Sequence, residues 1–112
     1  AISLWHVLEH LSDLKGDFEK FTKALKTGGH LFIAVPNHES YDAQYYGENW
    51  AALDVPLHLY HFKKDNIKDL AKDFGFDLIE IKNMPFDSYY VSMISELKMA
   101  KGVCFLPFVE VL

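Results

Sequence analysis

Arginine is absent from the sequence, and the 11 basic residues are lysines spread along the chain. The 16 acidic residues leave a formal net charge of -5. A nucleic-acid-binding face needs clustered cations that neutralise phosphates. Because the lysines form no such cluster, we expect no nucleic-acid partner.

Cysteine and long apolar runs are also scarce. Cys104 is the only cysteine, so no disulfide can form within the chain, which is typical of a protein from the reducing cytoplasm. No stretch reaches the roughly 18 apolar residues that cross a bilayer, because Pro107 and Glu110 interrupt the longest one, at 103–112. We therefore expect a cytoplasmic protein with no membrane partner.

Hydrophobic residues, by contrast, make up 50% of the chain and aromatic residues 15%, which is enough to build a buried core. The chain opens at once on an apolar, strand-like segment, Ala1 to Trp5, and stops within the apolar run 103–112. We therefore expect residues 1–112 to be a single partial domain, cut from a longer one.

Alternating strand and helix patterns predict an α/β fold with parallel strands and flanking helices. From 13 to 26 the apolar side chains recur at helical spacing, with Ser12 or Asp13 as N-cap, and Gly28-Gly29 ends the helix. Residues 30–35 are continuously apolar, which is typical of a strand buried on both faces. The other predicted elements are strands at 1–5 and 76–82 and helices at 63–74 and 88–101.

The segment 38–62 follows neither periodicity and is rich in aromatic residues. Long loops within compact domains are uncommon, and they are often binding loops or lids. We therefore interpret this segment as a lid-like loop.

Three local patterns occur in order along the chain. His6-Val7-Leu8-Glu9-His10 follows the first strand, Leu25-Lys26-Thr27-Gly28-Gly29 precedes a strand that ends in Pro36-Asn37, and the aromatic segment 50–62 leads into a helix and Gly75-Phe76. In this order and spacing, over about residues 1–97, the chain resembles the class I S-adenosylmethionine-dependent methyltransferases that act mostly on small molecules.

That resemblance implies the second half of a Rossmann-like methyltransferase fold, S-adenosylmethionine as cofactor and a small-molecule methyl acceptor. It also implies that the glycine-rich turn that holds the cofactor should precede this segment. The only adjacent glycines are Gly28 and Gly29, and no G-x-G-x-x-G motif occurs. We therefore expect the chain alone to bind the cofactor weakly or not at all, and to be inactive alone.

The resemblance places His6 just beyond the first strand, beside the reactive methyl group. There, a neutral imidazole could serve as general base, and we assign His6, Glu9 and His10 to the cofactor side. The alternative, equally open, is that His6 packs the loop while Glu9 and His10 brace the following helix.

On the acceptor side we assign Asn37, Trp50, His58 and Tyr60. Leu57 stands where the family often has a basic residue, which removes an expected anion contact. The competing interpretation makes Trp50 and Tyr60 ordinary core aromatics and Asn37 part of a turn.

Two other functions remain open. His6-x-x-Glu9-His10 also matches the H-x-x-E-H zinc-peptidase signature, which needs both histidines on one helix face and a third ligand such as His38, His58 or His61. The strand directly before the motif argues against such a helix, so we assign no metal site. A non-catalytic binding module, a homodimer through an exposed N-terminal strand, is the other alternative.

Overall fold

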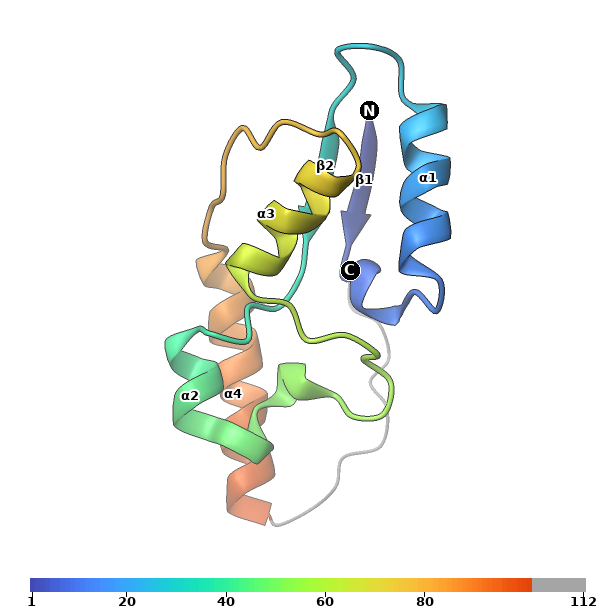
Figure 1. Cartoon of the computed structure of the whole chain (residues 1–112). Coiled ribbons are helices and arrows are strands. Elements are labelled where there is room, and N and C mark those ends of the chain that lie inside the picture. Colours follow the sequence, from blue (N-terminus) through green and yellow to red (C-terminus); the bar gives the residue numbers. More distant parts are fainter. Residues whose placement is uncertain (102–112) are drawn as a thin grey trace.

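The computed structural model describes residues 1–101 (Figure 1). In chain order the elements are β1 (Ile2–Trp5), the 3-10 turn η1 (Leu8–His10), α1 (Leu14–Ala24), β2 (Leu31–Ala34), α2 (Tyr41–Tyr46), the 3-10 turns η2 (Gly47–Asn49) and η3 (Ala51–Leu53), α3 (Lys64–Asp73) and α4 (Pro85–Lys101).

β1 and β2 form a parallel pair joined through α1, with Ile2 opposite Leu31 and Trp5 opposite Ala34. The backbone N–H of His6 donates to the carbonyl of Ala34 at 2.9 Å, which extends the pairing by one residue. The predicted α/β class with parallel strands is therefore confirmed.

The first hydrophobic core covers one face of this pair. Leu4, Leu8, Phe18 and Phe62 are its buried members, and apolar side chains of α1 and α3 pack against them. Successive strand residues point to opposite faces. The other face is therefore open: Phe32 of β2 is 56% exposed, so the prediction of a strand buried on both faces is wrong for the described part of the chain.

A second core joins α2 and η3 to α4, which lies beside α2 in Figure 1. Its buried members are Ala43, Tyr46, Trp50 and Ala52. The Tyr46 hydroxyl donates to Glu96 at 2.8 Å, which raises the pKa of Tyr46 to about 12. The segment predicted as an irregular loop at 38–62 thus contains a helix and two 3-10 turns, all too short to give a periodic signal.

The strand predicted at 76–82 is wrong. These residues are irregular, and the apolar residues Leu78, Ile79 and Ile81 are all exposed. A strand needs a neighbour for its backbone hydrogen bonds, and within residues 1–101 only β1 and β2 pair.

The last helix begins at Pro85, three residues before the predicted start, because proline suits the first helical position and Asp87 favours the first turn. None of the helices within the described residues is both long and apolar enough to cross a membrane.

Candidate functional site

The candidate site lies where β1 and β2 end, since parallel strands present their carboxyl ends at one edge of the sheet. His6 follows β1 directly and has a φ of 51°. This left-handed conformation is uncommon for a residue other than glycine, and such residues cluster at functional sites. The backbone therefore turns sharply at His6, immediately after the strand.

Both ring nitrogens of His6 face carboxylates. Nδ1 lies 3.4 Å from Oε1 of Glu9, and Nε2 lies 3.2 Å from Oδ2 of Asp87 in the first turn of α4. The nearby Glu9 carboxylate raises the pKa of His6; partial burial opposes it, and Asp87 raises the pKa further. The surroundings thus favour the imidazolium, which forms an ion pair with Glu9 and a hydrogen bond with Asp87.

Glu9 is buried, with 1% of its surface exposed. Its neighbour Leu8 is fully buried in the first core, so the η1 turn carries Glu9 inward as well. The Glu9 carbonyl accepts from the N–H groups of Leu59 at 2.8 Å and Tyr60 at 3.3 Å. These bonds hold the chain around residue 58 against η1.

His10 and His58 consequently meet beside Glu9. Their rings are perpendicular with centroids 4.6 Å apart, and Nε2 of His58 lies 3.9 Å from Oε1 of Glu9. Burial lowers the pKa of His58, although a hydrogen bond to Ala52 opposes the shift. His6 and His58 therefore flank the buried Glu9 carboxylate with opposite pKa shifts, because the pKa of His6 is raised and that of His58 is lowered.

On the predicted acceptor side, Trp50, His58 and Tyr60 line one narrow crevice, which has no room for a water molecule. Trp50 is buried at its edge and belongs to the second core, and Tyr60 stacks on Phe62 with ring centroids 5.8 Å apart. The structure therefore brings these three side chains together, but packed rather than open.

Asn37 does not line this crevice, although its neighbours Pro36 and His38 do. Its side-chain oxygen accepts from the Glu39 N–H at 3.0 Å, the arrangement of a local turn. In this structure its side chain thus shapes the chain after β2.

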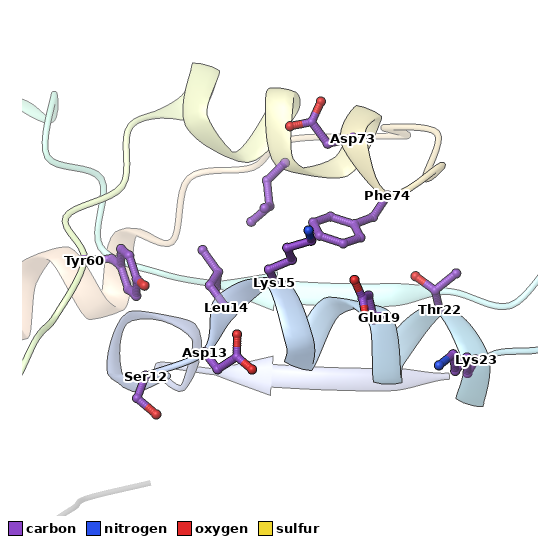
Figure 2. A pocket seen from close by; sticks show the side chains of 11 residues that line it. Ser12, Asp13, Leu14, Lys15, Glu19, Thr22, Lys23, Tyr60, Asp73 and Phe74 are labelled. Carbon is purple, nitrogen blue, oxygen red and sulfur yellow. The ribbon is translucent and has the colours of Figure 1, made fainter.

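Figure 2 shows a much larger hollow elsewhere, a groove of about 890 Å³ between α1 and α3. Leu14, Leu70 and Phe74 supply its apolar side chains. Tyr60 is its only lining residue among those predicted for the site. The groove runs along the helices rather than beyond the strand ends, so its size alone does not make it the candidate site.

Two further residues of the site, Asp87 and Asp54, were not predicted from the sequence. Asp87 contacts His6 from 81 positions away, and Asp54 lies 3.6 Å from Nε2 of His58. Pro85 followed closely by Asp87 is a helix-start signal, which could have placed Asp87 in a first turn. Nothing in the sequence links that turn to His6.

The zinc-peptidase arrangement is not formed within residues 1–101. His6 lies outside η1, which is a single 3-10 turn, so no helix presents His6 and His10 on one face. This geometry removes the structural basis of the H-x-x-E-H interpretation.

The chain matches a known protein family. A protein-family model described as a methyltransferase domain matches residues 1–81, from β1 through α3, out of 112. Searches of curated proteins and of solved structures found no significant match. The two parallel strands with their helices agree with part of a Rossmann-like methyltransferase fold, so the predicted family and fold class are confirmed. Asp87 and the rest of α4 lie outside the matched region.

Proposed function

This chain belongs to the methyltransferase domain family, and from that premise we propose that it takes part in S-adenosylmethionine-dependent methyl transfer to a small molecule. The observation that carries the proposal is His6, a strained residue directly beyond β1 whose ring is held between two carboxylates. Ligands of open α/β sheets bind beyond the carboxyl ends of strands, which is where His6 stands.

The described residues fit only part of the cofactor. None of the five glycines within residues 1–101 follows the carboxyl end of a strand, whereas a glycine turn there would let backbone N–H groups approach the cofactor closely. Residues 1–101 therefore contain no glycine turn that could bind the methionine part of the cofactor. S-adenosylmethionine supplies a methyl group on a positively charged sulfur. The residues that this chain would contribute to the reaction are His6 and those that line the crevice.

His6 can hold or release a proton at either ring nitrogen. Because its pKa is raised, the ring stays charged further into the neutral range than a free imidazole. A general base must be unprotonated, so any rate that depends on His6 as a base rises with pH through that raised pKa. Glu9 acts on the site through His6, as a positioning residue, because its own side chain is buried.

On the acceptor side, Tyr60 and His58 are the residues we propose to face a small molecule. Trp50 lines the same crevice, and its position is fixed because the side chain is buried in the second core. Asn37 contributes by setting the turn after β2. A ligand would have to widen the crevice by moving the segment 54–60 as a flap.

Because the described residues do not hold the methionine tail, the proposal is tested in a protein that joins this chain to a preceding glycine-rich cofactor-binding half. This protein is incubated with S-adenosylmethionine labelled in the methyl group and a panel of small hydroxyl, amine and carbon acceptors. We expect label in at least one acceptor, and a large loss of that transfer in His6→Gln. His30→Gln is the matched control, because His30 is exposed at the start of β2, away from the site. Absence of transfer, together with no S-adenosylhomocysteine-induced shift of the 6–10 amide signals by NMR, would contradict the proposal.

A second prediction concerns the charge of His6. Glu9→Gln is expected to lower the pKa of His6 toward 6.5, because Glu9 contributes the largest upward shift. NMR titration of the His6 ring measures this directly in metal-free buffer. Asp54→Asn is the control, because Asp54 faces His58 and not His6.

The same shift sets a pH dependence of stability. A histidine whose folded pKa is raised stabilises the protein fully below the unfolded value of 6.5, and this contribution is lost as pH rises through the folded pKa. The free energy of unfolding lost in His6→Gln should therefore shrink above pH 6.5. A loss that grows with pH would show that the ring is held neutral.

A further inference from the structure

Glu9, His10 and His58 form a cluster, and the methyltransferase proposal, which uses Glu9 and His58 separately, does not explain why the three converge. Each offers one ligand atom, and the three atoms lie within 4.8 Å of one another. Glu9 and His10 come from η1, and His58 follows the 3-10 turn η3 nearly fifty residues later. The bond from the Leu59 N–H to the Glu9 carbonyl fixes this approach.

The hydrogen bonds of the two histidines determine which nitrogen is free. Nδ1 of His10 lies 3.0 Å from the Leu57 carbonyl, and Nδ1 of His58 lies 2.8 Å from the Ala52 carbonyl. A carbonyl only accepts, so each Nδ1 carries the proton and donates. In the neutral ring Nε2 then holds a lone pair. Metal-bound histidines usually have this second hydrogen bond, which fixes the tautomer.

The carboxylate provides the second, independent observation. Neither side-chain oxygen of Glu9 has a hydrogen-bond partner among residues 1–101, although the side chain is 1% exposed. His6 lies at ion-pair distance, 3.4 Å from Oε1. A buried carboxylate without hydrogen bonds is costly, and here the lone pair on Nε2 of His58 also lies 3.9 Å from it. A cation between the three groups would relieve both costs.

We propose that Glu9, His10 and His58 form a binding site for a divalent transition-metal cation, for which Zn²⁺ is the fitting probe. One carboxylate oxygen and two imidazole nitrogens are a donor set that zinc accepts, whereas Mg²⁺ and Ca²⁺ prefer oxygen throughout. His10 is exposed, so the fourth position opens toward solvent for water or an oxygen-bearing ligand. This inference goes beyond methyl transfer and does not depend on it.

Zinc binding would draw together the three ligand atoms, which lie within 4.8 Å of one another. Zinc bonds of about 2.0–2.2 Å in a tetrahedron place the ligand atoms about 3.4 Å apart. Nε2 of His58 and Oε1 of Glu9 are already 3.9 Å apart. His6 is no ligand, because its nitrogens face Glu9 and Asp87. The site therefore differs from the H-x-x-E-H pattern, although that pattern shares Glu9 and His10 with it.

Titration of Zn²⁺ into the chelator-stripped protein tests the proposal without any methyl donor or acceptor. We expect one zinc per chain, a rise in melting temperature from binding to the folded state, and no competition from excess Mg²⁺. His10→Gln and His58→Gln should each weaken binding at least about 100-fold, the upper end of the cost of losing a mere second-shell partner. His30→Gln and His61→Gln are matched controls and should bind as the unaltered protein does.

NMR of the histidine rings keeps the test independent of whether the variants fold. In the unaltered protein, zinc should shift Nε2 of His10 and His58 while their Nδ1 atoms stay protonated. Lack of binding, a ratio other than one zinc per chain, or equal shifts at His30 and His38 would overturn the proposal. Retained zinc binding in folded His58→Gln would do so too.

Discussion

Phe18→Ala is expected to lower the free energy of unfolding by about 3–5 kcal/mol, the usual cost of removing a buried phenylalanine side chain. Phe18 is 1% exposed and central to the first core. Its ring lies 5.6 Å from that of Phe21 and 5.2 Å from that of Phe74, centroid to centroid. Because whole domains are stable by only about 5–15 kcal/mol, this change should remove a large part of the total.

Urea unfolding followed by circular dichroism measures the loss, with the midpoint lowered and the slope unchanged. Phe32→Ala is the matched control. Phe32 lies on the open face of the same sheet and is 56% exposed, so its loss should cost no more than about 1 kcal/mol. Equal losses in the two variants would mean that the open face is covered in solution, and that the core assignment is incomplete.

The features that sequence predicted well are those written locally. The α1 stripe needs only apolar residues at helical spacing, and its predicted cap Asp13 accepts from the Gly16 N–H at 3.0 Å. This stripe and cap depend on neighbours a few positions away. The predicted end of the helix is wrong: α1 ends at Ala24 and Leu25 is already extended, so Gly28-Gly29 does not end it. Gly28, with a φ of 80°, belongs instead to the turn that leads into β2.

The missing third strand illustrates the opposite case. Alternation at 76–82 is a local signal, but pairing depends on another segment far along the chain. The prediction that β2 is buried on both faces was wrong for a related reason. A continuous apolar run does not show which elements cover the strand. Strand propensity therefore predicted β1 and β2 correctly, because these two strands pair with each other. It failed for residues 76–82, which have no partner strand within residues 1–101.

The candidate site divides in the same way. His6 could be placed because it follows a strand directly, and the carboxyl end of a parallel strand is where ligands bind. Its contact with Asp87 could not be placed, because α4 returns to the site only through tertiary packing. The meeting of His58 with Glu9 was equally hidden, because it rests on backbone hydrogen bonds between η1 and residues 59 and 60.

Trp50→Ala is expected to lower the free energy of unfolding by about 3–5 kcal/mol as well. Trp50 is 4% exposed and packs among Ala43, Tyr46 and Ala52 in the second core. The adjacent Ala51 N–H donates to the Ser95 hydroxyl of α4 at 2.8 Å, which holds the segment in place. The sequence left two roles open for Trp50, a lid over an acceptor or a core aromatic. Its burial makes it the core aromatic in this structure.

The chain offers a control of the same residue type. Trp5 on β1 is 57% exposed, so Trp5→Ala should cost no more than about 1 kcal/mol. Urea unfolding compares the two variants, and acrylamide quenching of fluorescence in Trp5→Phe and Trp50→Phe reports which indole solvent reaches. If Trp50 were a lid, the result would be the reverse. Trp50→Ala would leave the free energy of unfolding nearly unchanged, and acrylamide would freely quench the Trp50 indole that remains in Trp5→Phe. Strong quenching of Trp50 together with a small loss of stability would therefore return Trp50 to the acceptor side of the site.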